Sequence, residues 1–323
     1  MRALVTGGAG FIGSHVVERL LAHGHSVTVL DDLSTGRLEN IAAGAKMIRA
    51  DVTDPHLART LARYKFDAVI HHAAQVSVSR SLADPRFDAQ VNLVGTMNVL
   101  DYAIQSGVSR FIFASSVAVY GDPHRLPAAE DHPAKPLSPY AVSKLAAEQY
   151  LRETARDTDV QVVILRYANV YGPRQSIRGE PGVACAMINH ILARTPVVIH
   201  GDGQQKRDFV YVSDVAKANL LALRNDTPCG VYNVGTGVST TILELKRLLV
   251  GSASKAELVP ARPGDVRHSV LDIGAIQSKM RWRPTVSLAA GLSRTWRYYL
   301  DPRNRVSYAP LPFTAPSASS ASY

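Results

Sequence analysis

An α/β fold built around a doubly wound parallel sheet is predicted by three features of this chain of 323 residues. Short apolar runs recur through its first half and alternate with stretches of helical periodicity, such as residues 96–105. A glycine-rich turn directly follows the first of these runs. Polar residues follow several of the others, at the edge where ligands of such sheets bind. Because the runs are almost wholly apolar, the strands are expected to be covered on both faces.

The glycine-rich turn reads GGAGFIG over residues 7–13 and has the spacing of a dinucleotide-binding fingerprint. Gly7 allows the tight turn, Gly10 lets the backbone approach a pyrophosphate, and Gly13 allows close packing of helix on strand. The helix that begins near Phe11 would direct its positive N-terminus at the diphosphate. The pattern predicts a nucleotide-binding domain of Rossmann type.

An acidic residue, Asp31, ends the second predicted strand 18 residues past Gly13. At this distance a carboxylate accepts hydrogen bonds from the adenosine ribose and repels a 2′-phosphate. The position favours NAD over NADP, although Arg37 nearby weakens that preference a little.

The predicted strands divide the chain into two domains and a tail. Before the boundary, which we place near Leu165, they cover residues 1–6, 26–30, 46–50, 68–71, 111–114 and 160–165. Residues 1–165 would form the Rossmann domain, and residues 166–302 a smaller carboxy-terminal α/β substrate domain. Segments near 207–235, with strands at 209–212 and 231–234, are expected to rejoin the first domain. Residues 303–323 become rich in Pro, Ser and Ala, which is typical of a disordered tail.

A second motif, YAVSK over residues 140–144, lies 24 residues after Ser116. Its spacing places the phenol of Tyr140 and the ammonium of Lys144 one turn apart on one helix face. The preceding Ser138-Pro139 suits an N-cap and a first helical position, so Tyr140 would lie in the first turn. There the helix dipole and Lys144 would both favour phenolate and bring the pKa down from its usual ~10 toward the range of a general base. The motif alone also fits a surface Tyr and Lys, but the dinucleotide fingerprint before it favours a nicotinamide-linked active site.

With these motifs in place, the sequence resembles the extended short-chain dehydrogenase/reductase family, most closely its UDP-sugar 4-epimerases. The resemblance extends from Met1 to about Leu300. Further motifs that carry it are DDLSTG at 31–36, SSVAVYG at 115–121, RYANVYGPR at 166–174, GDG at 201–203, RDFVYV at 207–212 and RPGDVR at 262–267.

The resemblance implies roles for the residues at matching positions, NAD as the cofactor and a UDP-sugar as the substrate. The implied catalytic residues are Ser116, Tyr140 and Lys144. The implied cofactor contacts are Gly7, Gly10, Phe11, Ile12, Gly13, Asp31, Asp51, Val52, Ala73, Tyr140, Lys144 and Tyr167. The implied substrate contacts are Ser116, Tyr140, Asn169, His200, Arg207, Arg262, Asp265 and Ser269. It also implies a homodimer formed through two helices of each subunit, one of which carries Tyr140.

Two arginines would clamp the nucleotide diphosphate together with Asn169. Planar guanidinium groups suit paired phosphate oxygens, which supports this role for Arg207 and Arg262 independently of the resemblance. An ion pair of Arg207 with Asp208, and a solvated Arg262, are the alternatives. By resemblance, Asp265 would contact the ribose and His200 would stack on the base, although an ordinary half-buried histidine fits His200 nearly as well.

The residues after Ser116 limit which reactions of this family are possible. At Val117 and Ala118 the 4,6-dehydratases and sugar-nucleotide decarboxylases that this family includes carry proton-transferring side chains, and neither residue here can transfer a proton. Dehydration and decarboxylation are therefore disfavoured. Epimerisation needs one alcohol–ketone interconversion, for which Ser116 and Tyr140 suffice.

Ser269, four residues after Asp265, bears on which sugars the substrate site accepts. Family members that exclude 2-acetamido sugars resemble one another in having a bulky aromatic residue at this position. A serine is expected to leave room for an N-acetyl group, so that UDP-GlcNAc and UDP-GalNAc are accepted beside UDP-Glc and UDP-Gal. Alternatives left open are a 4-epimerase of UDP-glucuronate or a UDP-pentose, a 4-ketoreductase, and a non-catalytic NAD-binding protein.

Composition adds few further limits. The net charge of +9 could attract anionic sugar nucleotides, but a solvated basic surface is the preferred interpretation, and no basic run or interleaved aromatic platform indicates nucleic acid. Cys185 and Cys229 form no disulfide framework and have no metal-ligand spacing, so no metal is expected. No apolar run approaches the ~20 residues of a membrane span, and no signal peptide is expected before a strand that starts at residue 1. A cytoplasmic enzyme without membrane partners is the expectation.

Overall fold

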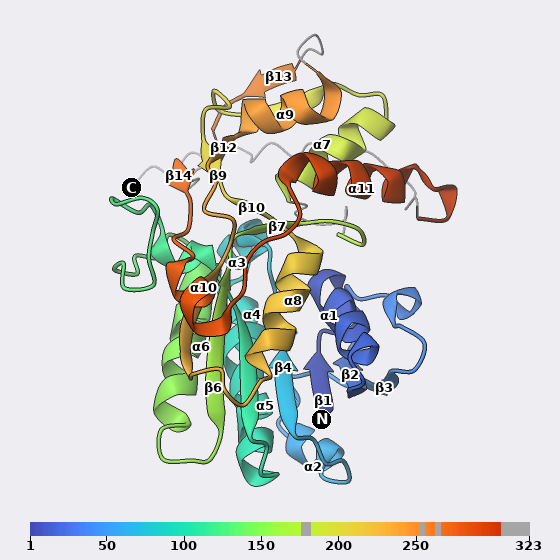
Figure 1. Ribbon diagram of the computed structural model, residues 1–323, viewed down its shortest axis with the longest axis vertical. Helices are drawn as coiled ribbons and strands as arrows, with labels where there is room; N and C mark the ends of the chain where they lie inside the picture. The colour runs from blue at the N-terminus through green and yellow to red at the C-terminus, as the bar shows by residue number, and fades with distance from the viewer. Residues whose placement is uncertain (176–181, 252–255, 262–265, 305–323) are drawn as a thin grey trace, which may run out of the picture.

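The computed structural model describes residues 1–175, 182–251, 256–261 and 266–304 (Figure 1). Seven parallel strands form the central sheet, in the order β11-β6-β5-β4-β1-β2-β3. They are β1 (Arg2–Thr6), β2 (Ser26–Asp31), β3 (Lys46–Arg49), β4 (Ala68–His71), β5 (Arg110–Ser116), β6 (Gln161–Tyr167) and β11 (Gly230–Val234). The chain order reverses between β1 and β4, and ligands of such sheets bind beyond this switch point. The predicted doubly wound parallel sheet is confirmed.

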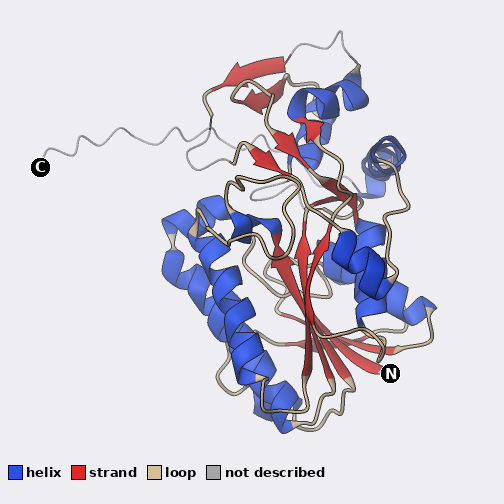
Figure 2. Ribbon diagram, turned by 60° about the vertical axis from the view of Figure 1, so that its left-hand side comes forward, coloured by secondary structure: helices blue, strands red, loops and turns tan. Residues whose placement is uncertain are grey.

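Helices cover both faces of the sheet (Figure 2). On one face lie α1 (Phe11–Ala22) and α8 (Val212–Ala222), and on the other α2 (Leu57–Leu61), α5 (Gly95–Gln105) and α6 (Pro139–Thr154). Successive residues of β1 point to opposite faces, so that Ala3 and Val5 join one apolar cluster and Leu4 joins the other. Burial on both faces explains why these strands are continuously apolar.

The segment between β4 and β5 contains further helices that pack against α6. They are α3 (Val78–Ala83), α4 (Pro85–Ala89) and a π-helical turn (Gln90–Val94) that leads into α5. A short 3₁₀ turn (Val117–Tyr120) follows β5, and another (Leu38–Asn40) lies between β2 and β3.

A smaller lobe lies beyond the carboxyl ends of the central strands, at the top of Figure 1. It contains α7 (Val183–Leu192), α9 (Ile242–Val250) and α11 (Leu288–Leu300), while α10 (Gly274–Met280) packs beside β11. Its strands form three small sheets: β7 (Asn169–Tyr171) with β10 (Phe209–Tyr211), β8 (Val197–His200) with β13 (Ala256–Val259), and β12 (Thr240–Thr241) with β9 (Lys206–Arg207) and β14 (His268–Ser269).

Two late segments return to the first half of the chain in different ways. Residues 231–234 do so as part of β11, which pairs with β6 and extends the central sheet. The segment at 209–212 instead supplies β10, which pairs with β7 outside that sheet, because β11 already occupies the outer edge of β6. The helix that follows, α8, packs against α1. The division of the chain near residue 165 stays a prediction.

The end of the chain lies mostly outside the described residues. Pro302–Asn304 form a 3₁₀ turn at the start of the predicted tail, and residues 305–323 are not described. Within the described ranges, no helix combines the length and the apolar character that crossing a membrane requires.

Candidate active site

The glycine-rich turn closes tightly against the loop after β4. Gly7 has a φ of +66°, and a Cβ there would lie 2.6 Å from the backbone nitrogen of Ala73. A Cβ on Gly13 would lie 2.2 Å from the carbonyl oxygen of Gly7. Gly10 is the N-cap of α1 and offers no side-chain acceptor to the first-turn N–H groups. This uncapped helix N-terminus at the switch point fits the diphosphate of a dinucleotide, and Phe11 and Ile12 form the first turn of that helix.

The carboxylate of Asp31 lies beside this turn at the end of β2. It accepts hydrogen bonds from the backbone nitrogens of Ala9 at 3.0 Å and Leu33 at 2.9 Å. Burial raises the pKa of Asp31, and these two N–H donors oppose the rise. The carboxylate thus orders the glycine-rich turn and the loop after β2, and its predicted contact with a ribose stays a prediction.

The two residues predicted to border the adenine follow β3. Asp51 is exposed and accepts a hydrogen bond from the backbone nitrogen of Thr53 at 2.8 Å. Val52 is buried, and the side chain of Asn98 on α5 donates to its carbonyl at 2.9 Å. Both therefore lie at the carboxyl edge of the sheet, where a cofactor would extend from the glycine-rich turn.

The end of β5 and the first turn of α6 bring together the three residues predicted to be catalytic. Ser138 caps α6 by accepting from the backbone nitrogen of Ala141 at 3.2 Å, and Tyr140 lies in the first turn, as predicted. Ser116 is the last residue of β5, and its hydroxyl accepts from the backbone nitrogen of Ala118 at 3.1 Å. The ammonium of Lys144 is buried and donates to the carbonyl of Ala114 in β5 at 3.0 Å.

The predicted effect of these surroundings on the phenol of Tyr140 is wrong in direction. Burial raises the pKa of Tyr140, a hydrogen bond with Ser116 opposes the rise, and the charge of Asp88 adds to it. Burial also lowers the pKa of Lys144 to about 8, against the opposing charges of Asp88 and Glu148. Lys144 is not among the groups that lower the pKa of Tyr140, and its ammonium is directed at the carbonyl of Ala114.

A pair of aromatic rings lies beside these groups at the ends of β4 and β6. The His72 ring stacks on that of Tyr167 at a centroid distance of 6.0 Å, and its Nε2 lies 3.1 Å from the Tyr167 hydroxyl. Burial lowers the pKa of His72 to about 3 and raises that of Tyr167. The hydroxyl of Tyr167 also accepts from Asn219 at 2.8 Å. Tyr167 is thus fixed against His72, the neighbour of Ala73, and the predicted contacts of Tyr167 and Ala73 with the nicotinamide half stay predictions.

In the smaller lobe, three of the predicted substrate residues meet around two short strands. Ser269 of β14 is the register partner of Arg207 in β9, and only 7% of its surface is exposed. The side chain of Asn169 in β7 donates to the carbonyl of Asp208 at 3.2 Å. The Asp208 carboxylate accepts from Thr236 and Gly237, so the structure gives Asp208 partners other than Arg207.

The other substrate residues are only partly described. His200 ends β8 and is half-buried, with its Nδ1 3.3 Å from the carbonyl of Pro260. Its predicted stacking on a base stays a prediction. Arg262 and Asp265, predicted to hold the diphosphate and the ribose, lie outside the described residues.

A buried ion pair beside the site was missed by the sequence reasoning. Glu148 lies one turn after Lys144 and receives two parallel hydrogen bonds from Arg166, from Nε at 2.9 Å and from Nη2 at 2.6 Å. The hydroxyl of Ser115 also donates to this carboxylate. The spacing of four residues from Lys144 was the available signal, because it places Glu148 on the same helix face.

A polar cluster between β4 and α6 was also missed. Gln75, Asp88 and Asn92 hydrogen-bond to one another, and Asn92 reaches Ser143 on the catalytic helix. Local sequence offers only the four-residue spacing of Asp88 and Asn92 as a sign of this cluster, because Gln75 and Ser143 come from distant parts of the chain.

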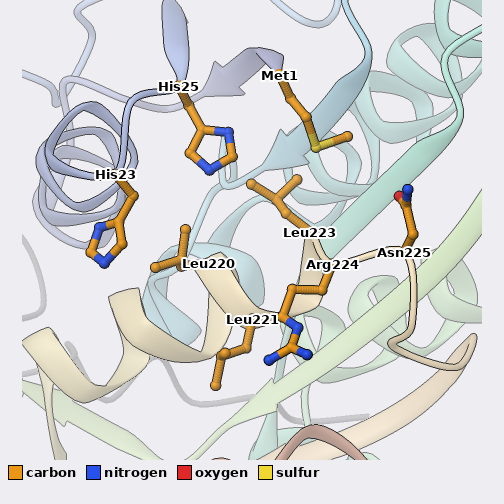
Figure 3. Close-up of a pocket in the computed structure, with 8 residues that line it drawn as sticks. All are labelled: Met1, His23, His25, Leu220, Leu221, Leu223, Arg224 and Asn225. Carbon is orange, nitrogen blue, oxygen red and sulfur yellow. The ribbon is translucent and has the colours of Figure 1, made fainter.

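A surface pocket of about 420 Å³ lies at the opposite end of the sheet (Figure 3). It borders the amino ends of β1 and β2, away from the carboxyl ends where Ser116 and Tyr140 gather. The residues that line it are Met1, His23, His25, Leu220, Leu221, Leu223, Arg224 and Asn225.

Comparison with known proteins agrees with this geometry. Residues 3–235 match the NAD dependent epimerase/dehydratase family. The chain is 43% identical over 311 residues to a UDP-glucose 4-epimerase of Mycolicibacterium smegmatis, covering 93% of this chain and 98% of that one. It superposes with a TM-score of 0.89 on the Thermotoga maritima UDP-glucose 4-epimerase solved with UDP-glucose, at 41% identity and with 93% and 99% of the chains covered. It also superposes on a UDP-N-acetylglucosamine 4-epimerase of Methanobrevibacter ruminantium, solved with UDP-N-acetylmuramic acid. The TM-score is 0.86 at 35% identity, with 93% of this chain and 98% of that one covered.

Proposed function

The chain belongs to the NAD-dependent epimerase/dehydratase family, and from that premise we propose that it is a 4-epimerase of UDP-hexoses. The family's dependence on NAD confirms the expected cofactor. The observation that carries the proposal is the meeting of Ser116, Tyr140 and Lys144 where β5 and α6 approach each other. Val117, next to Ser116, packs against the apolar core and supplies no second acid or base.

The residues that would hold NAD are those at the carboxyl edge of the sheet. They are Gly7, Gly10, Phe11, Ile12, Gly13, Asp31, Asp51, Val52, Ala73, Tyr140, Lys144 and Tyr167. When bound, NAD⁺ supplies reversible hydride acceptance, which interconverts an alcohol and a ketone.

The chain's own residues would handle the proton at the sugar 4′-oxygen. Tyr140 removes that proton and later returns it, and Ser116 hydrogen-bonds the same oxygen. The hydrogen bond from Ser116 also lowers the pKa of the phenol, against the burial that raises it. Arg207 would hold the diphosphate while the 4-keto sugar presents its other face, so that the stereochemistry at C4′ is inverted without net oxidation.

Direct observation of both sugar epimers tests the proposal. The purified protein, without added cofactor, is incubated separately with UDP-galactose and UDP-GalNAc, and the anomeric protons are followed by NMR. We expect both substrates to convert to their gluco epimers. If neither converts even after NAD is supplied, the proposed substrates are wrong, and UDP-glucuronate and UDP-pentoses are tested next. A 4-ketoreductase would instead consume added NAD(P)H stoichiometrically.

Acceptance of acetamido sugars would depend on Ser269. Its small buried side chain is the register neighbour of Arg207, close to where a diphosphate would lead into the sugar. The similarity to a UDP-N-acetylglucosamine 4-epimerase over 93% of the chain supports this wider specificity.

Replacing Ser269 by Tyr is expected to abolish turnover of UDP-GalNAc and to leave turnover of UDP-galactose within about threefold of the wild-type rate. A phenol at this position would occupy the space that the N-acetyl group needs, and a steric cost of about 3 kcal/mol or more lowers the rate at least about a hundredfold. Because the same variant is assayed with both sugars, UDP-galactose is its own control. Equal loss on both, or on neither, would remove Ser269 as the determinant.

A homodimer through α6 is part of the same proposal. Val142 and Tyr150 of α6 are about half exposed, at 51% and 48%, and Val94 before α5 is 38% exposed. Exposed apolar side chains on neighbouring helices suit a helix-to-helix contact with a second copy. Sedimentation equilibrium measures the mass that decides this point. The cytoplasmic location stays a prediction.

A further inference from the structure

One carboxylate outside the predicted site is buried beside the catalytic helix. Asp88, on α4, is 1% exposed, and its Oδ1 accepts from the side chains of Gln75 at 2.7 Å and Asn92 at 3.1 Å. Its Oδ2 is buried and has no hydrogen-bond partner among the described residues. A buried carboxylate with an unsatisfied oxygen is costly unless a nearby charge compensates it.

The hydrogen bonds around Asp88 connect it to the turn that carries Tyr140. Asn92 donates to the hydroxyl of Ser143 at 3.1 Å, and that hydroxyl donates to the backbone carbonyl of Tyr140 at 3.0 Å. Asn92 also exchanges two hydrogen bonds with the backbone of Gln75, both at 2.9 Å. The cluster therefore ties the loop after β4, the π-helical turn and the first turn of α6 together.

The buried ammonium next to this hydrogen-bonded cluster belongs to Lys144, which directly follows Ser143 on α6 and donates to the carbonyl of Ala114. The charge of Asp88 acts on it and raises its pKa, against the burial that lowers it to about 8. The same charge raises the pKa of Tyr140. The charge of Asp88 thus favours the cationic form of Lys144 in a setting that otherwise disfavours charge.

The other titratable groups around Lys144 do not replace Asp88. Glu148, on the next turn of α6, also raises the pKa of Lys144, but its carboxylate is held by Arg166 of β6. His71 and His72, at the end of β4, have lowered pKa values because of burial and are neutral at pH 7. Asp88 is therefore the carboxylate near Lys144 that lacks an ion-pair partner among the described residues.

We propose that Asp88 is a positioning residue, whose unpartnered oxygen supports the ammonium of Lys144 and whose other oxygen fixes the loop after β4 to the catalytic helix. The assignment rests on the proposed function, because it adds a buried carboxylate to the three residues of the proposed epimerase site. It goes beyond the three residues that bear directly on the reaction, since Asp88 acts through Lys144 and Tyr140 and not on the substrate.

The test compares Asp88→Asn with the wild type by two readouts. The first is the titration of Lys144, observed by NMR of ¹³C-labelled lysine and assigned with Lys144→Arg. The second is the pH profile of UDP-galactose epimerisation. Removing the negative charge is expected to lower the pH at which Lys144 loses its proton by about one unit. The basic limb of the profile should shift to lower pH with it. The acidic limb should also shift to lower pH, because the phenol ionises more readily.

Matched variants separate charge from structure. Asp88→Glu keeps the charge and should restore most of the wild-type titration. Asp101→Asn makes the same chemical change at an exposed position of α5 and should leave both readouts unchanged. Asp88→Ser, which removes the charge but keeps a hydroxyl for Gln75, provides the same test if the asparagine variant does not fold.

An unchanged Lys144 titration in Asp88→Asn or Asp88→Ser, with only a lower melting temperature, would overturn the assignment and leave Asp88 a structural residue. The titration does not depend on turnover. If the wild-type protein does not epimerise UDP-galactose, the proposed function fails, while the lysine titration still decides the role of Asp88.

Discussion

Replacing Tyr140 by Phe is expected to reduce epimerisation at least about a thousandfold while bound NAD is retained. Only the phenolic oxygen is removed, and proton transfer by a positioned side chain contributes about 10²–10⁴ in rate. The ring remains in the first turn of α6, which Ser138 caps, so the local fold is preserved. The measurement is the initial rate with UDP-galactose by NMR, alongside quantification of NAD released from the denatured protein.

The control for this prediction is Tyr150→Phe, on the same helix. Tyr150 is 48% exposed on the far part of α6, so loss of its hydroxyl should leave the rate within about twofold of wild type. Near-normal turnover in Tyr140→Phe would contradict the assignment of the phenol as acid and base. Loss of both turnover and NAD would indicate that the hydroxyl serves cofactor binding as well.

Replacing Glu148 by Gln is expected to lower the free energy of unfolding by about 3–5 kcal/mol. The side chains of Glu148 and Arg166 are only 3% and 8% exposed, and the guanidinium also lies 4.8 Å over the ring of Tyr120. Without the carboxylate, Arg166 would keep a buried charge with a neutral amide as its partner. Chemical denaturation of the variant and the wild type at equal NAD content measures the difference.

An exposed ion pair at the end of the same helix is the control for this second prediction. Glu153 pairs with Arg156, and both side chains are more than 60% exposed. Glu153→Gln should therefore change the free energy of unfolding by less than about 1 kcal/mol. If both variants lost a similar amount of unfolding free energy, burial would not be the reason why the Glu148–Arg166 pair stabilises the fold.

Several parts of the site could be predicted because their causes are local in the chain. The tight turn at Gly7, the start of α1 at Phe11 and the cap of α6 by Ser138 all follow from backbone geometry and hydrogen bonds over a few residues. The strands could be located for a similar reason, because burial on both faces leaves a continuous apolar run. Parallel pairing then necessarily brings Asp31 and Ser116 to one edge.

What the sequence by itself determined was therefore the positions of the central strands, the glycine-rich turn and the approach of Ser116 to the helix that carries Tyr140 and Lys144. Tertiary structure alone decided how these groups are charged and what surrounds them. It raised the pKa of Tyr140, directed Lys144 to a backbone carbonyl and buried Asp88 beside α6. It also placed β10 outside the central sheet. The physical reason is that desolvation and pairing depend on residues that are distant in the chain, whereas turns, caps and periodicity depend on neighbours.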